Sequence, residues 1–190
     1  MESIRTFIAL ELPEELKKSL GRLQSKFMER ASAVKWVRPE SIHLTLKFLG
    51  DINADRVVPV ERALEKLAAG IEPFFFDVAG IGAFPNCRNP KVIWAGMQAD
   101  DRLNMFLEEL ETALADMGFV REARPFAPHL TLGRLRDGRA RKDVAGLIEQ
   151  YGAERFGRFS ADHIIFFKSE LKPSGPVYRE IKNFTLMKNA

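Results

Sequence analysis

Residues 43–50 read HLTLKFLG and residues 129–135 read HLTLGRL, so nearly the same segment occurs twice. The likeness extends upstream, because RPESIHLTLKFL at 38–49 and RPFAPHLTLGRL at 124–135 share seven of twelve positions. Two of the chain's three histidines begin these copies. A motif repeated in matched context indicates two related halves within one fold.

Each copy also predicts which of its side chains point together. Alternate residues of a strand point to opposite faces, so each histidine shares a face with its threonine, His43 with Thr45 and His129 with Thr131. The leucines between them share the other face, which suits the core of each half. The two histidine–threonine faces are therefore expected to look into the space between the halves.

Length and composition fit one domain. The chain has 190 residues, of which 46% are hydrophobic and 15 are phenylalanine, which is enough apolar material for a packed core. No apolar run approaches the length of about 18 residues that a membrane span needs. The opening MESIRTFIALELPEEL lacks the long apolar region of a signal peptide. We therefore expect a cytoplasmic monomer that does not enter a membrane.

The net charge and the single cysteine limit which binding partners, disulfides and metal sites are expected. The net charge is +3, which permits an acidic partner without requiring one. The single Cys87 excludes an internal disulfide and a cysteine metal cluster, and we expect it to be at least half-buried. Five of the nine residues at 134–142 are basic. This run is either a solvated loop or a rim that faces phosphate.

The apolar pattern predicts eight strands and four helices. Strand-like segments span 3–11, 34–37, 43–49, 74–83, 91–97, 129–135, 155–169 and 176–187, with the first motif strand closed by Gly50. Helical spacing covers 13–30, 54–69, 100–117 and 141–150. This order predicts an α+β fold of two pseudo-symmetric lobes, each an antiparallel sheet with flanking helices, around a central cleft. We expect residues 1–190 to form a single domain of two intertwined lobes, each carrying one motif strand beside that cleft.

Two imidazoles and two hydroxyls in one cleft suit acid–base chemistry at phosphorus. Imidazole has an ordinary pKa of about 6.5, so near neutral pH one ring can accept a proton from water while another donates one to a leaving oxygen. Threonine hydroxyls donate hydrogen bonds to phosphate oxygens. Two other interpretations remain open. The histidines are core residues left by a duplication, or they form a metal site, which is weak because each motif supplies one good ligand.

No other catalytic motif competes with the repeat. The chain contains no GxxxxGKS/T phosphate loop, no GxSxG and no HExxH. His163 lies in ADHIIFF, outside any His-x-Thr context, and we assign it a structural role. Neither a metal nor a cofactor is expected.

The doubled motif, at residues 43–46 and 129–132, resembles that of the 2H phosphoesterase superfamily. Within this superfamily the chain is similar to the RNA 2',3'-cyclic phosphodiesterases, also called 2'-5' RNA ligases. The likeness covers essentially the whole chain, including the segments RTFIALELP, KFLGD, FAPHLTLGR and SELKPSGPVYREI.

The resemblance implies one 2H phosphoesterase domain with both motifs lining a central cleft. It implies metal-independent hydrolysis of the terminal 2',3'-cyclic phosphate of RNA or a nucleotide to a 2'-phosphomonoester. It also implies His43 as proton donor, His129 as proton acceptor, and Thr45 and Thr131 as phosphate-binding residues. The reverse reaction, which forms a 2'-5' linkage in RNA, uses the same groups and remains an alternative. A nucleotide-binding module without turnover is a further alternative, against which the intact pairs argue.

The two copies differ directly after the motif. Lys47 and Phe48 in the first copy correspond to Gly133 and Arg134 in the second. We expect Arg134 to bind the substrate phosphate through its fork of two donors. Strict alternation places Arg134 on the leucine face, so the strand must bend near Gly133. Phe48 is either a stacking surface for a base or, as the pattern favours, part of the core.

Overall fold

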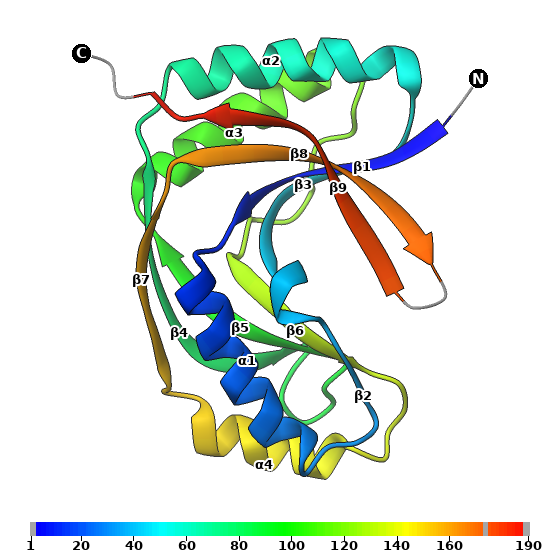
Figure 1. Ribbon diagram of the computed structural model, residues 1–190, viewed down its shortest axis with the longest axis vertical. Helices are drawn as coiled ribbons and strands as arrows, with labels where there is room; N and C mark the ends of the chain where they lie inside the picture. Colours follow the sequence, from blue (N-terminus) through cyan, green and yellow to red (C-terminus); the bar gives the residue numbers. More distant parts are fainter. Residues whose placement is uncertain (1–2, 173–174, 188–190) are drawn as a thin grey trace.

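Two antiparallel sheets stand side by side in the computed structural model, which describes residues 3–172 and 175–187 (Figure 1). Four strands form the first sheet, in the spatial order β3 (His43–Asn53), β1 (Ser3–Glu11), β8 (His163–Lys172) and β9 (Gly175–Thr185). Five strands form the second, in the order β2 (Val34–Trp36), β6 (His129–Leu135), β5 (Val92–Ala99), β4 (Phe74–Phe84) and β7 (Arg155–Ala161).

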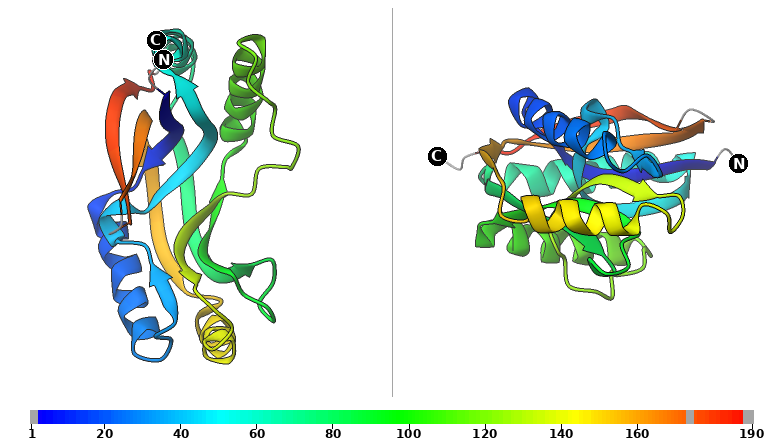
Figure 2. Two further views of the ribbon diagram at one scale, coloured as in Figure 1. Left: turned by 90° about the vertical axis from the view of Figure 1, so that its right-hand side faces the viewer. Right: turned by 90° about the horizontal axis from the view of Figure 1, so that it is seen from below.

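Helices flank both sheets. The described α-helices are α1 (Glu14–Met28), α2 (Val57–Ala69), α3 (Asp101–Asp116) and α4 (Arg141–Tyr151), and the 3₁₀ turns are η1 (Pro39–Ser41) and η2 (Ala54–Arg56). α2 packs against β8, β9 and α3, whereas α1 contacts β7 and α4 contacts β4. Figure 2 shows the two lobes from the side, with α2 and α3 at one end and α1 and α4 at the other. The predicted α+β fold, with an antiparallel sheet and flanking helices in each lobe, is confirmed.

Each lobe is built from separate parts of the chain. β2 pairs with β6 of the second sheet, although β1 and β3, which come before and after it in the chain, belong to the first sheet. β8, from the end of the chain, pairs with β1, and β9 pairs with β8. The motif strands β3 and β6 belong to different sheets, yet they contact each other where the lobes meet. The exchange of segments therefore holds the two lobes together and brings both motif copies to one place.

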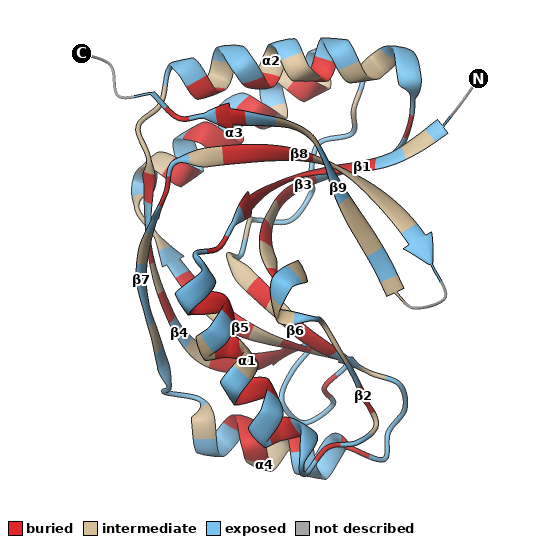
Figure 3. Ribbon diagram, viewed as in Figure 1, coloured by how far each residue is buried: buried red, intermediate tan, exposed pale blue. Residues whose placement is uncertain are grey.

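The hydrophobic core extends through both lobes. Its buried side chains come from every strand of the two sheets, with Phe184 as the contribution of β9, and from the inner faces of the helices (Figure 3). The motif leucines are part of it, as the alternation predicts, with exposed fractions of 1% for Leu44, 6% for Leu46, 0% for Leu130 and 1% for Leu132. Burial of one face of each motif strand leaves the opposite face for the cleft between the lobes.

Three local expectations were wrong. The first motif strand does not end at Gly50 but continues to Asn53, because Gly50 adopts a left-handed φ of 73° beside a shift in the register with β1. The predicted strand 155–169 is two strands, β7 and β8, which separate at Asp162 and join different sheets. Cys87 is exposed rather than half-buried, since it lies in the turn between β4 and β5.

Candidate active site

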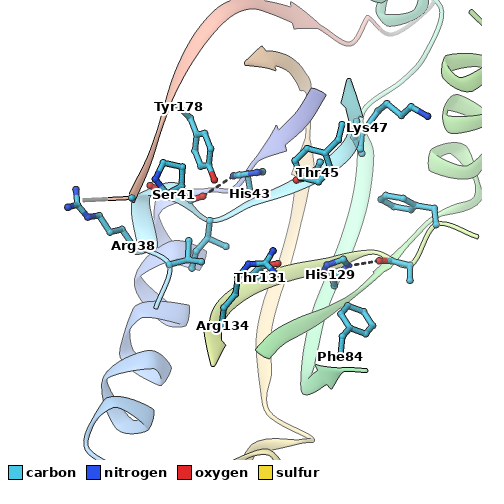
Figure 4. A pocket seen from close by; sticks show the side chains of 18 of the residues that line it. Arg38, Ser41, His43, Thr45, Lys47, Phe84, His129, Thr131, Arg134 and Tyr178 are labelled. Carbon is cyan, nitrogen blue, oxygen red and sulfur yellow. Dashed lines mark hydrogen bonds between the residues drawn. The ribbon is translucent and has the colours of Figure 1, made fainter. Parts of the chain in front are cut away.

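A cavity of about 780 Å³ lies between the lobes and is lined by both histidine–threonine pairs. His43 and Thr45 reach it from β3, and His129 and Thr131 reach it from β6. Figure 4 shows the first pair on one side of the cavity and the second pair on the other. A volume of this size fits a small-molecule ligand. The structure thus brings together the four residues that the repeat singled out.

The two histidines are held by the same backbone contact. Nδ1 of His43 lies 2.8 Å from the carbonyl oxygen of Ser41, and Nδ1 of His129 lies 2.8 Å from that of Ala127. A carbonyl oxygen only accepts hydrogen bonds, so each Nδ1 carries the proton and donates it. Each neutral ring then keeps a lone pair on Nε2, and each protonated ring has an N–H there. Both rings are therefore oriented to exchange protons through Nε2.

The surroundings of the two rings differ. His43 stacks on Phe7 with 4.9 Å between ring centroids and meets Tyr178 edge-on at 5.0 Å. Burial lowers the pKa of His43 below its ordinary value, and the Ser41 carbonyl and the charge of Glu11 oppose that effect in part. His129 has one aromatic neighbour in the described chain, Phe84, whose ring lies edge-on at 5.0 Å. The first histidine therefore sits in a more apolar place than the second.

Both motif strands carry a β-bulge at the same position. In β3 the partners of Thr45 and Lys47 are consecutive residues of β1, so that Leu46 is the extra residue. In β6 the partners of Thr131 and Gly133 are consecutive residues of β5, so that Leu132 is the extra residue. A bulge of this kind reverses the alternation of side chains beyond it.

The bulges decide which later side chains reach the cavity. Arg134 lines the cavity, which the strand permits because it bends at the point that the sequence required. Phe48, its counterpart, also lines the cavity and is 67% exposed. The expectation that Phe48 belongs to the core was wrong, because the alternation that buried it is interrupted at Leu46. Both copies therefore present their sixth residue to the cleft.

Gly133 has a packing role at the second bulge. A Cβ at this position would lie 2.8 Å from Cγ1 of Val34 and 2.9 Å from Cε3 of Trp36. Only a residue without a side chain lets β2 approach β6 this closely.

Gln24 of α1 forms hydrogen bonds with the backbone at the same bulge. Its side chain is 1% exposed, and its Nε2 donates to the carbonyl oxygens of Leu132 at 2.9 Å and Val37 at 2.7 Å. This residue was not predicted from the sequence. Its signal was a polar side chain on the apolar face of the predicted helix, four residues after Leu20.

Lys47 also lines the cavity, but its charge is directed away from it. Its side chain is 6% exposed, and Nζ lies 2.6 and 2.8 Å from the two carboxylate oxygens of Glu111 and donates to the carbonyl of Val120 at 2.9 Å. The same carboxylate accepts a hydrogen bond from the backbone N–H of Glu122. Lys47 therefore anchors the segment that leads from α3 toward His129.

Tyr178 of β9 is a further residue of the cavity that sequence reasoning missed. Burial raises the pKa of its phenol, while the nearby positive charge of Arg134 lowers it by a smaller amount. Tyr178 therefore keeps its O–H at neutral pH and is available as a hydrogen-bond donor. The segment PVYREI was noted only as part of the family likeness, because a tyrosine in a strand carries no functional signal by itself.

The remaining candidates lie elsewhere. His163 is outside the cavity, with Nδ1 2.6 Å from a carboxylate oxygen of Asp162. Of the basic run 134–142, Arg134 alone among the described residues lines the cavity, and Arg139 pairs with Asp137. In residues 3–172 and 175–187, no group of three or more His, Cys, Asp or Glu side chains could hold a metal ion. None of the helices described is long and apolar enough to cross a membrane.

Comparison with known proteins places the chain among phosphoesterases. The family described as LigT like phosphoesterase matches residues 10–94 and 96–178. An RNA 2',3'-cyclic phosphodiesterase of Methanothermobacter thermautotrophicus is 33% identical over 183 residues, which cover 96% of this chain and 99% of that protein. The protein of the same name from Methanocaldococcus jannaschii is 34% identical, covering 95% of this chain and all of its own length.

Solved structures agree with the fold described above. The crystal structure of TT0787 of Thermus thermophilus superposes with a TM-score of 0.83 at 30% identity, covering 96% of this chain and 98% of that one. E. coli LigT complexed with 3'-AMP superposes with a TM-score of 0.73 at 25% identity, covering 98% and 100% of the two chains. The likeness thus extends over both lobes and the cleft between them.

Proposed function

The chain belongs to the LigT-like phosphoesterase family, and from this membership and the geometry of the cleft we propose that it hydrolyses terminal 2',3'-cyclic phosphates of RNA or nucleotides. The product is a 2'-phosphomonoester. Relatives that are 33% and 34% identical over almost their whole length are named for this activity. The proposal takes residues 1–190 as one functional unit, because the cavity draws on elements from β2 to β9.

In the proposed mechanism His129 acts as the proton acceptor and His43 as the proton donor. Nε2 of His129 takes a proton from water as the water oxygen attacks phosphorus. The bond between phosphorus and the 3' oxygen breaks, and Nε2–H of His43 gives its proton to that oxygen. The hydroxyls of Thr45 and Thr131 donate hydrogen bonds to the non-bridging oxygens, and Arg134 balances the phosphate charge.

One observation carries this proposal. Both histidines bind a backbone carbonyl two residues upstream through Nδ1, at 2.8 Å in each case, and face one cavity from opposite lobes. The other nitrogen of each ring is thereby reserved for proton exchange. Histidines that serve only as packing residues have no need of matched tautomers on two sides of a cavity.

The lowered pKa of His43 bears on the order of events. A proton donor must be protonated, and burial opposes this in the free protein. A phosphate that enters the cavity brings a negative charge beside the ring, which favours the protonated form. Binding of substrate and protonation of His43 are therefore coupled, so that the cleft becomes competent when it is filled.

Metal independence is part of the proposal. The two imidazoles supply both the base that activates water and the acid that protonates the leaving oxygen, so the scheme contains no step that requires a Lewis acid. Ligation by the reverse reaction uses the same groups. Hydrolysis is favoured where water is the abundant nucleophile.

The direct test is product analysis. A short RNA that ends in a 2',3'-cyclic phosphate is incubated with the purified protein in EDTA, and the termini are identified by chromatography against RNA standards that end in a 2'-phosphate, a 3'-phosphate or a 2',3'-cyclic phosphate. We expect a 2'-phosphate at an undiminished rate. A 3'-phosphate would mean that the other ester bond breaks. Activity that disappears in EDTA and returns with a divalent ion would overturn the mechanism with two histidines. An added acceptor RNA with a 5'-hydroxyl end shows whether 2'-5' linkages also form.

A further inference from the structure

Two positive side chains stand directly opposite each other on the cleft side of the second sheet. Lys35 of β2 and Arg134 of β6 are cross-strand partners, both are exposed, and both line the cavity. Partners directly opposite each other in an antiparallel pair have their side chains within reach on the same face. Like charges in that arrangement destabilise the pair. No carboxylate relieves them, since neither forms an ion pair within the described parts of the chain.

A third cation extends this pair. Arg38 follows β2 by two residues, is exposed, and lines the same cavity. In the view of Figure 4, Arg38 and Arg134 lie on one side of the two histidines and Lys47 lies on the other. Lys47 is paired with Glu111, so its charge is already balanced. Arg124, on the segment between α3 and β6, is a further exposed cation of the lining. Lys35 and Arg38 cluster with Arg134 at β2 and β6, and we call Lys35 and Arg38 the basic rim.

The charge of the rim exceeds what the reacting group needs. A cyclic phosphate carries one negative charge, which Arg134 matches in the proposed mechanism. The described lining includes one carboxylate, that of Glu122, whose backbone is tied to Glu111 beside the paired Lys47. Local electrostatic conflicts of this kind are expected where a ligand resolves them. A ligand with further negative charges, spaced along a chain, would do so here.

We propose that the basic rim binds the backbone phosphates of a single-stranded RNA just upstream of its cyclic 3' end. This inference rests on the proposed function and makes an RNA strand, rather than a free cyclic nucleotide, the preferred substrate. RNA that ends in a cyclic phosphate continues only in the 5' direction, with one negative charge at each linkage. The strand leaves the cavity past Arg134, where Lys35 and Arg38 meet its phosphates.

The test compares an RNA strand with a mononucleotide. Wild type, Lys35→Gln, Arg38→Gln and the double variant are assayed on 2',3'-cyclic AMP and on a short RNA ending in a 2',3'-cyclic phosphate, at two salt concentrations that differ fourfold. For single strands the logarithm of affinity falls with the logarithm of salt by about 0.7 for each phosphate contact. Raising the salt fourfold lowers kcat/KM on the RNA. This fall is therefore expected to be about 2.6-fold smaller for each single variant than for wild type. The values on cyclic AMP should not change.

A matched control and a binding assay separate this proposal from the proposed function. Lys66→Gln neutralises an exposed lysine of α2 that does not line the cavity, and it should leave both substrates unaffected. Fluorescence anisotropy of labelled RNA with a 2'-phosphate end measures the same salt slopes without turnover. If wild type hydrolyses neither cyclic AMP nor the RNA but the variants still flatten the binding slope, the proposed function is wrong and the proposal for the basic rim is supported. If the variants have the same kcat/KM on RNA as wild type at both salt concentrations, the proposal that the basic rim binds RNA phosphates is wrong. It is also wrong if the loss is equal on both substrates.

Discussion

The two motif strands share the positions of a histidine, a threonine and a bulge, and differ in the residues that follow the bulge. β3 and β6 each present a histidine fixed through Nδ1, a threonine on the same face, and a bulge after the threonine. Beyond the bulge, β3 carries Lys47 and Phe48, and β6 carries Gly133 and Arg134. In the proposed mechanism, the duplicated part supplies the groups for proton exchange, and the part that differs supplies a phosphate-binding arginine from β6 only.

The difference also extends to the depth of the histidines. His43 is enclosed by Phe7 and Tyr178, while His129 has the edge of Phe84 beside it. Burial favours the neutral form of His43 until an anion arrives. A symmetric frame with asymmetric surroundings is thus able to give two identical side chains different tasks. The experiments below test that division, beginning with the largest expected effect.

Removing either histidine should have the largest effect. His43→Ala and His129→Ala are each expected to lower kcat on 2',3'-cyclic AMP by about 10²- to 10⁴-fold, the usual range for general acid–base groups. The double variant should lose much less than the product of the two, because acid and base act in one step. Steady-state kinetics with folding checked by circular dichroism measures this. His163→Ala is the control and should retain the rate per folded molecule.

A substrate with sulfur in place of the 3' oxygen sharpens the comparison between the rings. A thiol has an ordinary pKa of about 8.5, so the sulfur leaves as a thiolate without a proton donor. It should restore much of the rate of His43→Ala and little of the rate of His129→Ala. The reverse pattern would exchange the two assignments.

Arg134 and Phe48 should differ in the next largest effect. A hydrogen bond to a charged group contributes about 1.5–3 kcal/mol, so Arg134→Ala is expected to lower kcat/KM on cyclic AMP by about 10- to 150-fold. Arg134→Lys keeps the charge but loses the planar fork, and it should fall between wild type and the alanine variant. Phe48→Leu should stay within about twofold of wild type, as for an exposed substitution. Wild-type kinetics in Arg134→Ala would show that the arginine does not bind the reacting phosphate.

The alternation of the repeated motif was sufficient to predict that four motif side chains share one cavity, but not the rest of its lining. His43, Thr45, His129 and Thr131 face one cavity because alternation of a strand is a strictly local property. The bend that brings Arg134 to the cavity was required for phosphate binding but not visible in the sequence. Bulges depend on pairing with β1 and β5, which no local pattern reveals. For the same reason Phe48 was misplaced.

The point at which the chain passes from the second sheet to the first, between β7 and β8, could not be predicted from the sequence either. Asp162 alone separates β7 from β8, with neither glycine nor proline to mark the change of sheet. Both strands therefore read as a single run of apolar and polar residues. The buried Gln24 was hidden for another reason. One polar residue on an apolar helix face is common, and its partners, the carbonyls of Val37 and Leu132, are distant in the sequence.

Gln24→Met should reveal whether the bulge positions Arg134. Methionine fits the space but donates to neither Val37 nor Leu132. The hydrogen bond to Leu132 is the one at the bulge, and its loss of about 0.5–1.5 kcal/mol predicts a two- to tenfold fall in kcat/KM. The loss of both hydrogen bonds should also lower the free energy of unfolding, but by less than their sum, because Oε1 of Gln24 is buried without a partner among the described residues and its removal offsets part of the loss. Kinetics and urea denaturation measure the two effects separately.

A double-mutant cycle separates positioning from packing. In the background of Arg134→Ala, Gln24→Met should cause no further fall in kcat/KM, because the group it positions is already absent. Leu23→Ala is the control. It should destabilise α1 by about 2–5 kcal/mol and leave kcat/KM per folded molecule unchanged in both backgrounds. Additive losses from Gln24→Met and Arg134→Ala would mean that Gln24 acts on the site by another route.

The smallest predicted effect concerns stability against pH. Burial lowers the pKa of His43 in the folded protein below the ordinary value of about 6.5. Above that value the ring is neutral in both states and contributes no pH dependence. As the pH falls below it, the unfolded chain binds a proton that the folded chain does not, so stability is lost down to the folded-state pKa. The slope from one group is at most about 1.4 kcal/mol per pH unit.

His43→Asn removes this titration while keeping an amide that can donate to Ser41. The free energy of unfolding of wild type minus that of the variant should therefore be smaller at about pH 5 than at about pH 7.5, as measured by urea denaturation at both. Other titrating groups cancel in this difference. A difference that does not change with pH would mean that His43 is as readily protonated in the folded cleft as in the unfolded chain. The free protein would then hold its proton donor ready before substrate binds, and the coupling between phosphate binding and protonation of His43 would be unnecessary.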